Sequence, residues 1–315
     1  MLRRLSVRGK ILATLAIPVV VLVIAAVIIA GQSISTAVTG GQSKAIAEAT
    51  KSHDALMTAL QNEYTVTLDN ATTGAKGTAA ITKARAATDT ALSGYLGEAE
   101  HIDLGVYADD VAASWDTAAA DLRNIDSSRA SVDGALASAA SISPLPVIHT
   151  TYGSMVDAQA SFYETLTSSL TDRDLARSFQ LYTETFALRS AYANEVRVAT
   201  PLLETGRGAT ISDADATSGV AALQATNSDV ESVTQSLDQL QLSTIEVPTF
   251  SVTQSIARAA ILAGRADRAT QASLDAWPQD TATFSAALVD MQAKVRLHVT
   301  DAATTASAEI GRAHV

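Results

Sequence analysis

The chain has 315 residues, of which 47% are hydrophobic, enough to build a sizeable folded core. Cysteine is absent and aromatic residues make up 4% of the chain, so packing alone must hold the fold together. The net charge is −11, although four of the 22 basic residues lie in the first ten positions. Because phosphate recognition needs positive charge, the acidic remainder of the chain excludes nucleic acid as its partner.

An uncharged apolar segment, ILATLAIPVVVLVIAAVIIAG, occupies residues 11–31. At ~1.5 Å per residue it is long enough to cross the ~30 Å hydrocarbon core of a bilayer, so we predict a transmembrane helix. The basic residues 1–10 then face the cytoplasm, and the chain from residue 32 onward is extracytoplasmic. This predicts a protein of the cell membrane with a single span in this sequence. The alternative is a cleaved signal peptide, whose apolar region is usually shorter.

Beyond residue 31 the sequence predicts one helix after another. Alanine-rich segments carry apolar residues at three- and four-residue spacing, and no segment alternates with period two for long enough to form a convincing strand. Clusters of Gly, Pro and Asx residues predict helix breaks at 70–77, 101–105, 141–146, 204–215, 245–250 and 276–280. We therefore expect an all-α fold of about eight helices, packed as bundles.

The sequence predicts no catalytic residues, no metal site and no cofactor. The five histidines, at positions 53, 101, 149, 298 and 314, lack zinc-site spacing and are predicted to be surface or helix-face residues. The segment TTGAKGT lacks the spacing of a phosphate-binding loop. Whether a larger parent protein is an enzyme is left open by these residues.

One arginine falls inside an apolar stripe. Leu175, Phe179, Tyr182 and Phe186 recur at helical spacing, and Arg189 continues the series, so its side chain should point into the bundle. A buried guanidinium needs a carboxylate, carbonyl groups or a bound anion. Arg189 is therefore either a structural residue, ion-paired or snorkelling at the seam, or an anion-binding residue.

A second arginine extends another stripe in the same way. Arg129 continues the series that begins at Trp115, although the intervening NIDSS segment is a possible helix break. It is a further candidate for ligand binding.

Three segments resemble one known family. They are DALMTALQNEYTVTL at 54–68, FALRSAYANEVRV at 186–198 and LSVRGKILATLAIPVVVL at 5–22. Together they resemble the nitrate- and nitrite-sensing domain of actinobacterial sensor histidine kinases, over nearly the whole chain. The resemblance implies a pair of extracytoplasmic four-helix bundles, held between two membrane spans and followed inside the cell by a kinase module. Such family members bind nitrate or nitrite through inward-facing arginines.

The first family motif, roughly L-Q-x-E-R-G, matches at Leu60, Gln61 and Glu63. Tyr64 stands where the motif has its arginine, and it lies on an inward-facing stripe. The resemblance therefore places Glu63 and Tyr64 at the candidate ligand site.

The second motif, roughly K-E-x-A-x-x-E-R, places Arg189 at the basic position and Glu195 at the acidic one. Val196 replaces the second arginine, and Arg197 follows one residue later, about 100° further around the helix. The full set of candidate ligand-binding residues is Arg189, Arg197, Tyr64, Glu63, Glu195 and Arg129.

The sequence ends with ASAEIGRAHV, and no residues typical of a helix C-terminus precede this segment. The last six residues, 310–315, correspond to one reading frame of a common sequencing adapter, so we expect them to be an artefact. The extracytoplasmic sensor region is then 32–309, and we expect a second span and the kinase module to be missing from this sequence.

The predicted function is that of the sensor region of a membrane-bound, two-component-type signalling protein that detects nitrate, nitrite or another small anion. Ligand binding would shift the first and last helices against each other, by piston or rotation. We also expect a homodimer formed through the membrane-proximal helices. The alternatives are a membrane-anchored helical scaffold without a small ligand, and a sensor with a chemotaxis or cyclase output.

Overall fold

The computed structural model describes residues 42, 44–71, 78–138, 143–203 and 212–312. Over this part of the chain it contains nine α-helices, two short 3-10 helices and no strand. The predicted all-α class is therefore confirmed. The predicted span over residues 11–31 lies outside the described residues, as do residues 1–10. None of the helices within the described ranges is long and apolar enough to cross a bilayer.

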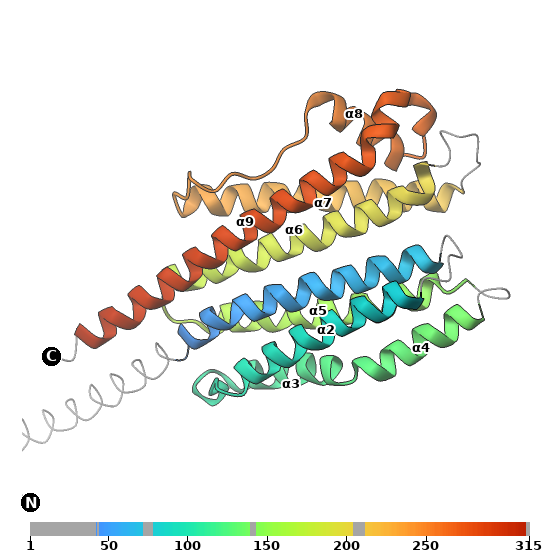
Figure 1. Cartoon of the computed structure of the whole chain (residues 1–315). Helices are drawn as coiled ribbons and strands as arrows, with labels where there is room; N and C mark the ends of the chain where they lie inside the picture. The colour runs from blue at the N-terminus through green and yellow to red at the C-terminus, as the bar shows by residue number, and fades with distance from the viewer. Residues whose placement is uncertain (1–41, 43, 72–77, 139–142, 204–211, 313–315) are drawn as a thin grey trace, which may run out of the picture.

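Five of the helices form one bundle, which is the lower group in Figure 1. They are the helix over residues 44–71, α2 (Thr78–Ala99), α3 (Asp109–Arg123), α4 (Ile125–Ala137) and α5 (Leu145–Ser169). The nine helices of the described ranges exceed the expected eight, because the chain also breaks at 170–172, at 263–270 and at Asn124, the first residue of the NIDSS segment. This residue ends α3 and begins α4, with φ −91° and ψ 12°.

The other four helices form the second bundle. They are α6 (Arg173–Leu203), α7 (Asp213–Gln239), α8 (Val252–Leu262) and α9 (Gln271–Arg312). Serine side chains cap two of them: Ser212 accepts a hydrogen bond from the backbone of Asp215, and Ser251 forms a capping box with Gln254.

The break predicted at 276–280 is wrong, because α9 runs through Pro278. Trp277 is buried against Leu202 and Ile261, which belong to α6 and α8. Pro278 is the eighth residue of this 42-residue helix, so it removes one backbone hydrogen bond and its ring crowds the carbonyl of Leu274. Tertiary packing of the tryptophan therefore outweighs the local cost of the proline.

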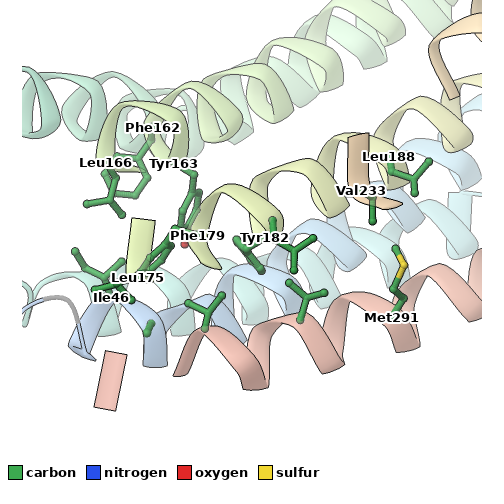
Figure 2. Close-up of a cluster of buried hydrophobic side chains, with 14 of the residues drawn as sticks. Ile46, Phe162, Tyr163, Leu166, Leu175, Phe179, Tyr182, Leu188, Val233 and Met291 are labelled. Atoms are coloured by element: carbon green, nitrogen blue, oxygen red, sulfur yellow. The ribbon is translucent and has the colours of Figure 1, made fainter. Parts of the chain in front are cut away.

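One hydrophobic core joins the two bundles. Figure 2 shows Ile46 from helix 44–71 and Tyr163 from α5 beside Phe179 of α6, with Val233 of α7 and Met291 of α9 further along. Because these side chains are buried in one continuous cluster, the bundles pack as a single body. Helix 44–71 begins and α9 ends at the same end of that body (Figure 1).

Helix α7 packs closely against the end of α8 at Gly219. A Cβ atom at this position would lie 2.1 Å from the backbone oxygen of Leu262 and 2.8 Å from Leu202 Cδ1. Backbone atoms cannot move aside as a flexible side chain can. The glycine is therefore required by the approach of the two helices.

Replacing Gly219 with alanine should lower the free energy of unfolding by about 2–3 kcal/mol, since the helices must separate to admit the methyl group. The matched control is Gly94→Ala in α2, whose added Cβ would meet no atom within 4 Å. It should raise the free energy of unfolding by about 0.5–1 kcal/mol through its better helix propensity. Urea denaturation of both variants measures the difference. Equal stability of the two would contradict the close approach.

Candidate functional site

A cavity of about 280 Å³ lies between the two bundles and is lined by residues of helix 44–71, α5 and α6. The wall is partly apolar, with contributions from Met57, Leu60, Val156, Phe186 and Ala193. The polar side chains lining it are Gln61, Tyr64, His149, Tyr152, Asp157, Arg189, Ser190, Asn194 and Arg197.

A hydrogen-bonded chain of three side chains crosses one end of the cavity. His149 Nδ1 lies 2.8 Å from the Tyr64 hydroxyl oxygen, and His149 Nε2 lies 2.8 Å from Arg197 Nη1. An arginine can only donate, so Nε2 accepts and the imidazole proton of a neutral ring sits on Nδ1. Nδ1 then donates to Tyr64, which leaves the tyrosine hydroxyl hydrogen available to a ligand. Arg197 is also held by the side chain of Asn194 on its own helix.

Burial keeps both His149 and Tyr64 uncharged at neutral pH. Burial, followed by the charge of Arg197, lowers the pKa of His149 to about 4, so the ring is neutral at pH 7. Burial raises the pKa of Tyr64 to about 12, against an opposing effect of Arg197, so the phenol keeps its proton. The end of the cavity therefore presents one full positive charge and neutral donors.

Arg189 is buried, as the apolar stripe predicted, with 7% of its surface exposed. It donates to Gln292 Oε1 at 2.5 Å and to Thr58 Oγ1 at 3.1 Å. No carboxylate lies within ion-pair distance of Arg189 or of Arg197 in the part of the chain that the structure describes. Burial lowers the pKa of Arg189, although Asp54 and Tyr182 oppose this, and an arginine remains charged at neutral pH.

Arg189 connects the cavity to helix 44–71 and α9, the first and last helices that the structure describes. Gln292 of α9, which accepts from Arg189, donates to Asp54 Oδ1 of helix 44–71 at 2.7 Å. The other oxygen of Asp54 lies 3.2 Å from Arg296 Nε, also on α9. Burial raises the pKa of Asp54 to about 6, although Tyr182 and both arginines oppose this. A displacement of Arg189 would therefore alter the hydrogen bond between Gln292 of α9 and Asp54 of helix 44–71.

A buried ion pair lies within the first bundle. Arg129 of α4 donates from Nε and Nη2 to the two oxygens of Glu63, each at 2.8 Å, and from Nη1 to Asp89 of α2 at 2.6 Å. The Tyr152 hydroxyl donates to Glu63 Oε1 at 2.8 Å. Burial alone would raise the pKa of Glu63, but the hydrogen bonds from Arg129 and its neighbours outweigh it and lower that pKa. The fully buried carboxylate is thus held in its charged form.

The second bundle repeats this arrangement. Arg258 of α8 donates from Nε and Nη2 to the two oxygens of Glu195 at 2.5 Å, and from Nη1 to Asn227 of α7 at 3.0 Å. The guanidinium also lies over the ring of Phe250, 4.8 Å from its centroid. In both bundles an Asn-Glu pair on the first helix provides the carboxylate and the second helix provides the arginine's further partner, while the arginine comes from α4 in one bundle and from α8 in the other.

The structure thus divides the six predicted site residues into two groups. Tyr64, Arg189 and Arg197 line the cavity, and whether they contact a ligand stays a prediction. Glu63, Arg129 and Glu195 are bound in the buried ion pairs.

Sequence reasoning missed the histidine and the α9 residues of the site. His149 was expected to be a surface or helix-face residue, but it is half-buried and bonded on both nitrogens. His53, with the same expectation, is fully buried among the rings of Tyr95, Tyr163 and Phe186. No motif marked either residue, or Gln292. Only the position of Gln292 at helical spacing from Leu288 and Val295 could have placed it inward.

A family model described as nitrate and nitrite sensing matches residues 55–305. The chain belongs to the nitrate- and nitrite-sensing family. The match spans both bundles and includes all six predicted site residues.

The fold of this family member is similar to a solved structure, that of the NasR transcription antiterminator. The TM-score is 0.65 at 13% sequence identity, and the match covers 90% of this chain and 74% of that one. At this identity the likeness concerns the fold. No curated protein matches the chain.

Proposed function

We propose that this chain is a sensory domain that binds a small planar anion, nitrate or nitrite, in the cavity between its bundles. The observation that carries the proposal is the presence of two cavity-lining guanidinium groups, Arg189 and Arg197, without a carboxylate partner among the described residues. Guanidinium groups match the geometry of planar oxyanions. Membership of the nitrate- and nitrite-sensing family supports this choice of ligand.

In this proposal Arg197 and the Tyr64 hydroxyl hold the anion directly. Arg197 keeps N–H groups beyond those used by His149 and Asn194, and Tyr64 has its hydroxyl hydrogen free. The neutral tyrosine replaces the arginine of the family motif, so one positive charge fewer faces the ligand. We therefore expect binding that is weaker than in a site with two direct arginines.

Arg189 would transmit the effect of ligand binding from the cavity to helix 44–71 and α9. An anion attracts this guanidinium, weakens its hydrogen bonds to Gln292 and Thr58, and so alters the contact of Gln292 with Asp54. Helix 44–71 and α9 would then shift against each other. The apolar segment 11–31 supports a location in the cell membrane, and the resemblance supports a histidine-kinase output. The homodimer through the membrane-proximal helices is part of the same proposal.

Nitrate titration of the purified chain by isothermal calorimetry tests the proposal. Arg197→Gln should weaken binding about 10- to 100-fold, since one charge-assisted interaction contributes about 1.5–3 kcal/mol. The control is Arg177→Gln on the same helix, whose exposed guanidinium lies 3.5 Å from Asp174 and outside the cavity. It should leave the affinity unchanged. Failure of the wild-type chain to bind nitrate or nitrite, or equal affinity of the Arg197 variant, would overturn the proposal.

A further inference from the structure

The cavity is larger than a nitrate ion requires. Its volume is about 280 Å³, whereas an engineered cavity of about 150 Å³ in another protein already admits benzene, which has six heavy atoms. Nitrate has four. A nitrate ion held at Arg197 would therefore leave most of the cavity to water.

The chemistry of the wall changes along the cavity. On α6 the lining residues run from Phe186 to Arg197, which are separated by about 16 Å at 1.5 Å per residue. Tyr64 and His149 are bonded to the Arg197 end, so it is the polar end. Phe186 belongs to one apolar cluster with Met57 and Leu60, against which Val156 packs, and all four line the cavity. Arg189 lies one turn further along α6, where Gln292 and Thr58 already accept from its guanidinium. A ligand with a charged head group and an apolar body matches this change from a polar to an apolar wall.

We propose that the cavity binds an organic monocarboxylate whose carboxylate occupies the Arg197–Tyr64 end and whose apolar body, about the size of a phenyl ring, lies towards Phe186. The inference rests on the proposed function, because it uses the same anion-binding end. A carboxylate resembles nitrite and nitrate in its planar pair of oxygens, so the same guanidinium can take either. The apolar body adds affinity that nitrate cannot gain, about fourfold for each buried methylene equivalent.

Arg189 and Asp157 also line the cavity and do not contradict a single carboxylate. Arg189 uses two of its nitrogens on Gln292 and Thr58, so its donors are already partly occupied. Asp157 is an acid, and a second carboxylate on the ligand would be repelled by it. The ligand class is therefore a monocarboxylate with an uncharged body.

Gly153 of α5 offers a way to fill the cavity without disturbing the fold. It lines the cavity together with Tyr152 and Val156, and a Cβ atom added to it would meet nothing within 4 Å. A leucine here can extend into the empty space and also favours the helix. The matched control is Gly94→Leu, at an exposed position of α2 that is equally open and lies outside the cavity.

The test compares nitrate and benzoate binding to the full chain by isothermal calorimetry, with benzamide as the uncharged analogue. Benzoate should bind at least tenfold more tightly than nitrate and compete with it, and benzamide should not bind. Gly153→Leu should weaken benzoate at least tenfold and change nitrate less than threefold. Gly94→Leu should change neither, and circular dichroism should show both variants folded.

Two failures are distinguishable. If nitrate binds in an Arg197-dependent way but benzoate binds no more tightly, or if Gly153→Leu affects both anions equally, the monocarboxylate inference is overturned and the proposed function stands. If neither anion binds the wild-type chain, both fail. Tight, Arg197-dependent benzoate binding without nitrate binding would support the inference and overturn nitrate as the ligand.

Discussion

Glu195→Gln should lower the free energy of unfolding by about 3–5 kcal/mol, because it leaves the buried guanidinium of Arg258 without its charged partner. The Glu195 side chain is fully buried, and that of Arg258 is 8% exposed. In the native protein the two groups are joined by two hydrogen bonds of 2.5 Å. After the change, Asn227 and the ring of Phe250 remain beside the charge. Neither neutralises it.

Chemical denaturation with circular dichroism measures this loss, and two further variants make it interpretable. Removing both partners, with Glu195→Leu and Arg258→Met together, should be markedly less damaging than the single change, since no charge stays buried. Asp290→Asn breaks the exposed pair with Lys294, whose side chains are 67% and 50% exposed, and should change stability by less than about 1 kcal/mol. A double variant as unstable as Glu195→Gln would contradict the burial argument.

Acidification should destabilise the protein through His53. Burial, and then the charge of Arg189, lowers the pKa of His53 from its ordinary value of 6.5 to about 3. Below pH 6.5 the unfolded chain therefore binds a proton at His53, whereas the folded chain does not. The free energy of unfolding falls as the pH decreases from 6.5 towards 3. Between pH 6.5 and pH 4.5 this amounts to about 2 kcal/mol.

The comparison that isolates this effect uses His53→Phe, which keeps an aromatic ring among Tyr95, Tyr163 and Tyr182 but cannot titrate. The wild-type protein should lose about 2 kcal/mol more than the variant between pH 6.5 and pH 4.5. Asp54 titrates in the opposite sense, since burial raises its pKa to about 6, but it is present in both proteins. Identical pH dependence of the two would show that His53 is not buried as a neutral ring.

The sequence was sufficient for the fold class and for part of the site. Apolar residues at three- and four-residue spacing predicted helices because only one face of each can be buried. The same spacing placed Arg189 and Tyr64 on inward faces, and both line the cavity. These predictions depend on residues close together in the chain, so local periodicity is enough to make them.

Partners that are distant in the chain could not be predicted in this way. Glu63 pairs with Arg129 and Glu195 pairs with Arg258, across 66 and 63 positions, because in each bundle a later helix packs back against the first one. Periodicity says which face is inward but does not say which helix will meet it.

Tertiary packing also produced features that differ from what local sequence patterns predicted. It kept α9 continuous through Pro278, since burying Trp277 stabilises the helix more than the missing hydrogen bond weakens it. It buried His53 as a neutral ring and placed His149 between Tyr64 and Arg197. The character of the site depends on these contacts, because burial and neighbouring charge, which no single segment carries, set the protonation of each group.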